Sequence, residues 1–208
     1  TSPLTAGAAT TDRLDAVNTL ELQITGTSLT TTLGEGLSVP ASATAASLNI
    51  TVVNPEAEGY LTVWPCGPRP LASSLNFSRG QVVPNGIIAP LSAQGSICLF
   101  SNAPTDVIVD VAGWFDGDAF SGAMPQRLVD TRNGTGGTRA KIEPSRPRAF
   151  PVTDQAVTSP LGTAARSPGS MAAAALNVTV VNPEGDGYIT VWPCGSARPN
   201  ASNINFTP

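Results

Sequence analysis

The three cysteines are the residues of this chain with the clearest chemistry. Cys66 and Cys194 each lie between Val-Trp-Pro and Gly, whereas Cys98 has no counterpart elsewhere in the sequence. Because Cys66 and Cys194 hold the same position in two copies of one segment, Cys98 is the expected disulfide partner of Cys66. Cys194 is then either unpaired or bonded to another chain. Three reduced, buried thiols are the alternative.

The chain contains no histidine. This excludes a nucleophile activated by histidine, either Ser-His-Asp or Cys-His, and it removes the commonest metal ligand. No C-x-x-C pair is present either, so a zinc site is not expected. We therefore predict a protein that is not an enzyme and that needs no metal and no cofactor.

A charged pair stands out in the segment RLVDTR at 127–132. In an extended strand, alternation places Asp130 and Arg132 on one face, where they would form a structural ion pair. Asp110, on the polar face of residues 106–111, is expected to join them by taking an arginine of this segment as its partner. Recognition of a sugar or peptide through Arg132 is an alternative. A glycosidase that uses Asp110 and Asp130 as its two carboxylates is a remote one.

Aromatic residues recur in two equivalent Gly-Tyr-x-Thr-Val-Trp segments. They provide Tyr60 and Trp64 in the first segment and Tyr188 and Trp192 in the second. Aromatic planes on one face of a strand could stack on sugar rings, which makes these four residues the best candidates for carbohydrate binding. The same alternation is typical of aromatic side chains buried in a core.

The segment LNITVVNPEAEGYLTVWPCG at 48–67 returns at 176–195 with 16 of 20 positions identical, 128 residues further along. This spacing suits a small domain, so we expect tandem domains at 1–118 and 119–208. The first copy continues for three more predicted strands, whereas only two residues follow Phe206, so the second copy is incomplete. Another chain would complete it, or the sequence is a fragment. In the region of RLVDTR, the first copy offers only residues 12–15, which indicates a diverged or lost strand.

Apolar and polar residues alternate with a period of two along most of the chain, and turn signals such as Asn-Pro and Pro-Asn-Gly separate the alternating runs. The pattern predicts an all-β protein, an antiparallel β-sandwich of jelly-roll or immunoglobulin-like topology. Strands are expected at 20–25, 48–52, 59–64, 74–77, 86–89, 96–100 and 106–112. Residues 172–175 are expected to lead into a strand of the second copy, and 127–132 to form a short strand.

Composition limits the function further. The chain is 41% apolar, only 12% charged and carries a net charge of −4 with scattered basic residues. This argues against nucleic acid, which needs a clustered basic surface. No apolar run approaches the roughly 20 residues that span a bilayer, so membrane insertion is not expected. With its cysteines, this composition indicates a secreted, extracellular or cell-surface protein.

The ordered motifs RLVDTRNGTG, ALNVTVVNP, GYITVWPCG, SSLNF and DVAGWF resemble a repeat module of secreted and cell-surface proteins from actinomycete-type bacteria. The resemblance covers nearly the whole chain. It implies a β-rich accessory module, often in tandem beside hydrolase or protease domains, with no catalytic residues of its own.

These observations leave three candidate functions. The first is a non-catalytic structural or assembly module that self-associates or contacts neighbouring domains, with strand exchange from a neighbouring subunit completing the second copy. The second is a carbohydrate- or cell-wall-binding module, whose partner would be a polysaccharide. The third, an enzyme, is the least expected.

Overall fold

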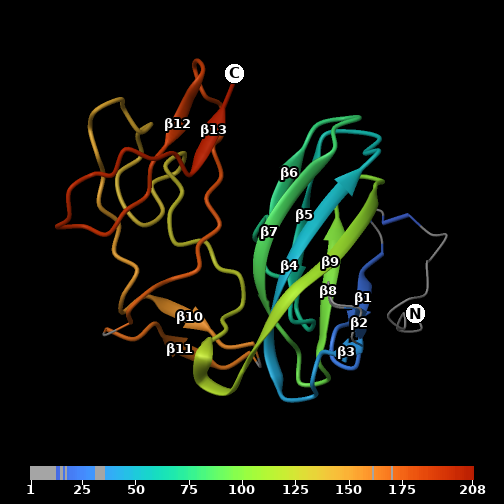
Figure 1. Ribbon diagram of the computed structural model, residues 1–208. Coiled ribbons are helices and arrows are strands. Elements are labelled where there is room, and N and C mark those ends of the chain that lie inside the picture. The colour runs from blue at the N-terminus through green and yellow to red at the C-terminus, as the bar shows by residue number, and fades with distance from the viewer. Residues whose placement is uncertain (1–12, 15, 17, 31–35, 161, 170) are drawn as a thin grey trace.

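The computed structural model describes residues 13–208, apart from 15, 17, 31–35, 161 and 170. Figure 1 shows residues up to about 119 as layered strands and the remainder as loops with two short hairpins. The described elements are strands and one short 3-10 helix, η1 (Gly117–Ala119). None of the described residues belongs to a helix long and apolar enough to span a membrane. The all-β prediction is confirmed.

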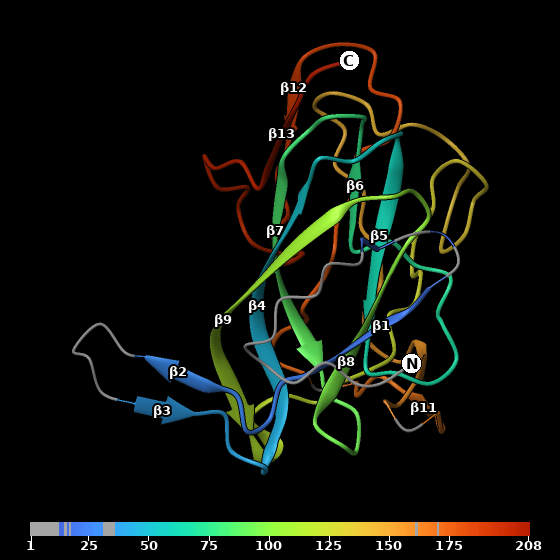
Figure 2. The same ribbon diagram turned by 90° about the vertical axis from the view of Figure 1, so that its right-hand side faces the viewer.

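The first half contains two antiparallel sheets and a separate hairpin. The first sheet has the order β1-β8-β5-β6, formed by β1 (Leu20–Gln23), β5 (Gly59–Trp64), β6 (Leu75–Phe77) and β8 (Ser96–Ser101). The second has the order β7-β4-β9, formed by β4 (Ala43–Val53), β7 (Val83–Pro90) and β9 (Asp106–Asp116). The hairpin of β2 (Ser28–Thr30) and β3 (Gly36–Ser38) projects away from both sheets (Figure 2).

The two sheets share one hydrophobic core, consistent with a β-sandwich. Leu48 and Ile50 of β4 alternate with half-buried polar residues, and Leu61 and Val63 of β5 join them from the other sheet. Successive strand residues point to opposite faces, so this alternation buries one face of each strand. The apolar pattern that predicts the strands therefore also builds the core.

Strand β8 is buried on both faces. Its Ile97 and Leu99 enter the shared core, whereas Phe100, on the opposite face, packs with Trp64 in a second apolar cluster. Met124, which follows the first half in sequence, packs against that cluster. Met124 thus covers part of the outer face of the first sheet.

The predicted strands match the observed ones closely in the first half. The range 59–64 is β5, and the other predicted ranges all overlap strands. The prediction of a strand at 127–132 is wrong: Asp130 forms a single bridge to Thr135, and residues 131–134 are a turn. Two hairpins were not predicted, β2–β3 and the pair β10 (Ala156–Thr158) and β11 (Ala164–Arg166).

The second half repeats one hairpin of the first. Its β12 (Gly187–Ile189) pairs with β13 (Ile204–Phe206), and Gly187 lies opposite Phe206 as Gly59 of β5 lies opposite Phe77 of β6. Each glycine allows a close approach of the phenylalanine ring, because an added Cβ would lie under 3 Å from ring atoms. The hairpin forms in both copies because its two strands lie close together in the chain.

The counterpart of β4 in the second half is not a strand. Residues 172–181 form no strand, although their sequence nearly repeats that of β4. In the first half, β4 lies between β7 and β9, and both of its edges are hydrogen-bonded. The described second half has no counterparts of these two strands, so the backbone of 172–181 lacks the partners that would make it a strand. The expectation that residues 172–175 lead into a strand is therefore wrong here.

Candidate functional site

The structure joins Cys66 and Cys98 in a disulfide, as the repeat predicts. The two Cα atoms are 4.8 Å apart, within the usual range for such a bond. Cys98 lies opposite Trp64 in the pairing of β5 with β8, and Cys66 follows Trp64 by two residues. Glu21 lies beside the two sulfur atoms, the one group of possible metal ligands among the described residues. Because both sulfur atoms are oxidised, neither is a thiolate ligand, and the group does not suit a metal.

Cys194, the counterpart of Cys66, is free and exposed. The part of the second half that the structure describes contains no strand equivalent to β8, which would carry the counterpart of Cys98. The two copies therefore differ in redox state at one equivalent position. Cys194 has the exposure that a thiol needs to react with another chain.

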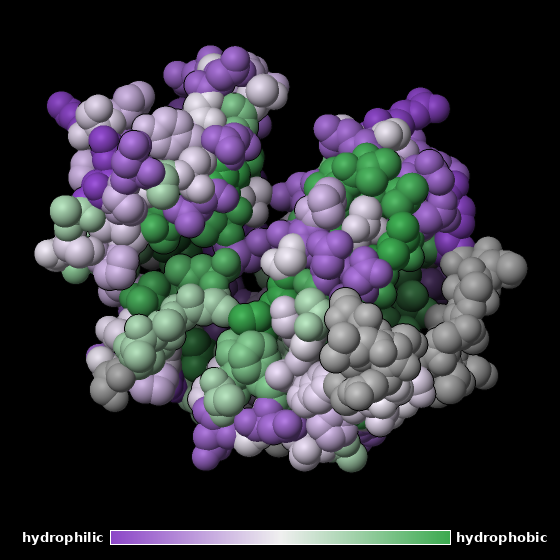
Figure 3. All heavy atoms as spheres, viewed as in Figure 1, coloured by the Kyte–Doolittle hydropathy of each residue, from purple (hydrophilic) through white to green (hydrophobic). Residues whose placement is uncertain are grey.

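Several residues that fill the core of the first half have exposed counterparts in the second half. Leu48 is 2% exposed and its counterpart Leu176 is 48% exposed; Val63 is 3% exposed and its counterpart Val191 is 44% exposed. The exposed large apolar residues of the second half are Ile142, Leu176, Val178, Val181, Tyr188 and Val191. Figure 3 shows hydrophobic surface on both sides of the hollow between the two halves. Large apolar side chains that are exposed in this number within one half indicate an interaction site.

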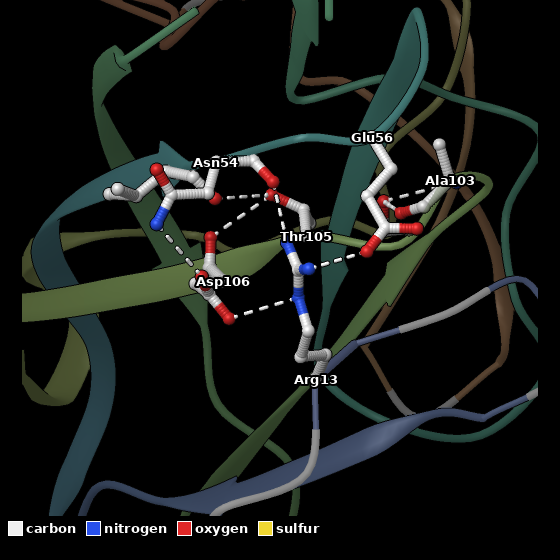
Figure 4. Close-up of polar contacts among 8 residues, drawn as sticks. Arg13, Asn54, Glu56, Ala103, Thr105 and Asp106 are labelled. Carbon is white, nitrogen blue, oxygen red and sulfur yellow. Dashed lines mark hydrogen bonds and ion pairs between the residues drawn. The ribbon is translucent and has the colours of Figure 1, made fainter. Parts of the chain in front are cut away.

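A charged cluster surrounds Arg13 at one end of the first half (Figure 4). The guanidinium donates to Glu56 Oε1 at 2.5 Å and to the carbonyl oxygen of Asn54, and its Nε lies 3.1 Å from Asp106 Oδ1. The side-chain amide of Asn54 donates to the same Asp106 carboxylate at 3.1 Å. The neighbouring Leu14 positions Arg13, because its backbone forms two hydrogen bonds with Thr105. One cation thus ties the turn after β4 to the start of β9.

The second half contains the counterpart of this cluster. Lys141 lies 128 residues after Arg13, and its Nζ donates to the carbonyl oxygen of Asn182 at 3.2 Å and to Glu184 Oε1 at 2.6 Å. Asn182 and Glu184 are the counterparts of Asn54 and Glu56. The hydrogen bond from Lys141 lowers the pKa of Glu184 below its usual value. The described second half supplies no counterpart of Asp106, so this cluster lacks its third member.

Sequence reasoning missed both clusters. The interpretation of residues 12–15 as the remnant of RLVDTR is corrected here, because Arg13 occupies the position of Lys141 and not that of Arg127 or Arg132; Asp12 and Asp15 lie outside the described residues. A signal was present in the sequence. Arg13-Leu14-Asp15 and Lys141-Ile142-Glu143 match in residue type at the same spacing of 128 residues as the long repeat.

Asp130 is buried at the centre of a tight turn. Its carboxylate accepts hydrogen bonds from the backbone N–H of Arg132, from the Arg132 guanidinium at 2.9 and 2.7 Å, and from Arg127 Nη1 at 3.0 Å. The hydrogen bonds from Arg132 hold the pKa of Asp130 well below its usual value. The Asp130–Arg132 pair therefore exists, but the turn creates it and strand alternation does not.

Asp110 is not part of this ion pair. It is exposed in the middle of β9, and among the described residues neither Arg127 nor Arg132 forms an ion pair with it. Its strand is paired along its length with β4, and the turn at Asp130 satisfies its own arginines. The predicted ion pair of Asp110, Asp130 and Arg132 is therefore wrong in one member, because Asp130 and Arg132 form it without Asp110.

The candidate aromatic residues are not arranged as a platform. Trp64 is only 2% exposed, and its Nε1 donates to the carbonyl oxygen of Gly67. Tyr60 and Trp192 are half-buried, and Tyr188 is 60% exposed. A groove of about 730 Å³ opens beside the disulfide, but its described lining contains prolines, small residues, Arg69 and Arg127, and no aromatic residue.

The two aspartates at the ends of β9 are also bound to protein groups. Asp106 belongs to the Arg13 cluster, whereas Asp116 accepts hydrogen bonds from Ser42 Oγ and Trp114 Nε1. Both carboxylates thus already have protein donors as partners.

Among its described residues, the second half therefore carries exposed apolar side chains, a free thiol at Cys194 and a Lys141 cluster without a counterpart of Asp106. Comparison of the chain with protein-family models, with curated proteins and with solved structures finds no match.

Proposed function

We propose that this chain is a non-catalytic structural and assembly module of a secreted or cell-surface protein. β-Strands from a neighbouring subunit would complete its second half. The observation that carries the proposal is the exposure, in the second half, of the residues that form the core of the first half. The described second half has no counterparts of β7, β8 and β9, so it offers open strand edges and exposed apolar residues, and added strands satisfy both.

The disulfide supports an extracellular location. Disulfides form and persist in oxidising compartments and are rare in the cytosol. The resemblance to secreted actinomycete modules points the same way and favours a tandem array, in which each complete unit is a sandwich like the first half. Neighbouring units of one array would then be natural partners for the second half.

Carbohydrate binding has weaker support. A sugar-stacking surface needs exposed aromatic planes, and Trp64 is buried under Met124 and the loop that contains Gly67. Tyr188 is the one exposed member of the predicted set, and a single aromatic residue does not form a platform.

Light scattering tests the proposal. The mass of the full chain in solution should rise with protein concentration, and the oligomers should dissociate when Val178→Lys places a charge on the exposed face. Ile108→Lys is the matched control, because Ile108 is an exposed apolar residue of β9 in the completed first half. This substitution should leave the mass unchanged. A constant monomer mass over the whole concentration range would contradict the proposal.

A further inference from the structure

We propose that the second half binds a β-segment with the chemistry of residues 83–116, and that Cys194 and Lys141 recognise it at two fixed points. This inference rests on the proposed function and names the partner that it leaves open. The partner segment contains three strands with alternating apolar residues, a cysteine in the middle strand and an aspartate at the start of the last strand. Its two polar residues stand at the spacing of Cys98 and Asp106.

The unpaired strand edges of the second half define how many strands the partner segment contains. In the first half, β7 and β9 pair with the two edges of β4, and β8 pairs with β5. The counterparts of β4 and β5 are residues 171–181 and 187–192, and only Gly187–Ile189 is hydrogen-bonded as a strand, on the side of β13. Three strand edges are therefore unpaired in the described second half. A segment that supplied fewer than three strands would leave at least one of these edges unpaired.

Cys194 defines the first fixed point. In the pairing of β5 with β8, Trp64 lies opposite Cys98, and this register brings Cys98 to Cys66. A partner strand in the same register beside 187–192 would place its cysteine opposite Trp192 and next to Cys194. Formation of the bond oxidises two thiols. Their two electrons and two protons pass to a small-molecule disulfide such as oxidised glutathione, which leaves as two thiols.

Lys141 defines the second fixed point. Arg13 contacts Asn54, Glu56 and Asp106, and the Asn54 amide holds the same aspartate. Lys141 already contacts Asn182 and Glu184, so the first two contacts of the cluster exist before any partner arrives. A partner aspartate in the position of Asp106 would meet both the Lys141 ammonium and the Asn182 amide.

The two fixed points lie at opposite ends of one strand. In the first half, the Asn54–Glu56 turn precedes β5 and Cys66 follows it. Alternation of apolar residues specifies which face of a strand is buried, but it tolerates a slip of two residues. A covalent contact at one end and a charge contact at the other end remove that freedom and also set the direction of the strand. The second half therefore selects a partner by register as well as by hydrophobicity.

The first experiment incubates the full chain with a synthetic peptide of residues 81–118 in a glutathione redox buffer. Intact mass and peptide mapping measure a disulfide between Cys194 and the peptide's Cys98. We expect this adduct to form in the chain with an intact Cys66–Cys98 bond and to disappear in Cys194→Ser. The matched control peptide exchanges Ile97 and Cys98, which keeps the composition and moves the thiol to the other face of the strand. If the exchanged peptide reacts as fast as the native one, the inference is overturned.

A charge exchange tests the second fixed point. Asp106→Ala in the peptide, or Lys141→Ala in the chain, should slow adduct formation about fivefold, the size of effect expected for one exposed ion pair. Lys141→Glu in the chain should be slower still and should recover with the Asp106→Lys peptide. Rates that do not depend on either residue would overturn the role of Lys141.

The outcomes for the two proposals can be distinguished. Oligomers in light scattering without a peptide adduct would leave the assembly function standing and overturn this partner. A register-specific adduct on a chain that stays monomeric would support this partner and contradict self-assembly. Disulfide dimers through Cys194 alone, formed equally well in the presence of the peptide, would count against the partner.

Discussion

The two halves of this molecule give nearly the same sequence two different structures. Residues 48–53 form part of a long central strand, whereas the equivalent residues 176–181 form no strand. Sixteen of the twenty residues in the repeated segment are identical, so local preference does not explain the difference. What differs is the presence of β7 and β9. Strand β4 therefore forms because its distant partners pair with it, and not because of its own residues alone.

Other features survive in both halves. The Thr62 hydroxyl donates to the carbonyl oxygen of Ala72 at 2.6 Å, and its counterpart Thr190 donates to Ala201 at 2.6 Å. Asn54 and Asn182 share a left-handed backbone conformation, with φ values of 51° and 50°. These contacts join residues close in the chain, so the closure entropy that they cost is small. Local structure is therefore independent of the missing strands.

The largest difference in unfolding free energy between equivalent substitutions in the two halves is expected when a leucine is truncated to alanine. Leu48→Ala should lower the free energy of unfolding by about 2–5 kcal/mol, because it leaves a cavity in a packed core. The equivalent Leu176→Ala should change it by less than about 0.5 kcal/mol, because Leu176 is half-exposed. Urea unfolding of the full chain, followed by fluorescence in a Trp192→Phe background, measures the first half. Equal effects of the two variants would contradict the comparison.

The next largest difference in unfolding free energy is expected between the removal of the disulfide in the first half and the removal of the free thiol in the second half. Removal of the Cys66–Cys98 bond by Cys98→Ser should cost about 3 kcal/mol, since the bond closes a loop with a sequence separation of 32 residues. Cys194→Ser should be nearly neutral for unfolding, because Cys194 is exposed and has no disulfide partner in the described structure. Both variants can be compared by their urea midpoints. A large effect of Cys194→Ser would show that the second half contains a bond not seen in this structure.

The stability of the Asp130 turn should depend on pH. The described first half contains no equivalent turn. Because the folded state lowers the pKa of Asp130, the turn gains stability above the unfolded value of about 4 and loses it as pH falls through the lower folded pKa. Slow exchange of the Gly134 amide, which donates to the Asp130 carbonyl, should persist at pH 4 and fade in stronger acid. Asp130→Asn should abolish the slow exchange at neutral pH, and Asp110→Asn should not. Unchanged exchange in Asp130→Asn would contradict the assignment.

The smallest difference should come from the two cation clusters. Arg13→Ala should cost about 1 kcal/mol or less, the usual range for exposed ion pairs. Lys141→Ala should have a smaller effect still, because Lys141 has two partners where Arg13 has three. The difference in urea midpoints between the variants measures this. In a complex with the 81–118 peptide, the effect of Lys141→Ala should grow to match that of Arg13→Ala. If it does not grow, the third contact is not formed.

The sequence predicted the first half well because alternation reports directly which strand residues are buried. It located β5 to the residue and overlapped the other sandwich strands. It missed the hairpins β2–β3 and β10–β11, whose short strands consist largely of small and polar residues with little alternation. It also missed the Arg13 cluster, because its members lie up to 93 positions apart and only folding brings them together.

The sequence by itself determined the all-β class, the repeated segment and the pairing of Cys66 with Cys98. These follow from residue type and spacing, which need no coordinates. Only the tertiary structure decided that Trp64 is buried, that Asp130 binds its arginines within a turn, and that 176–181 has no strand partner among the described residues. The physical reason is the same in each case: burial and strand pairing depend on distant segments, and the sequence of one segment does not contain that information.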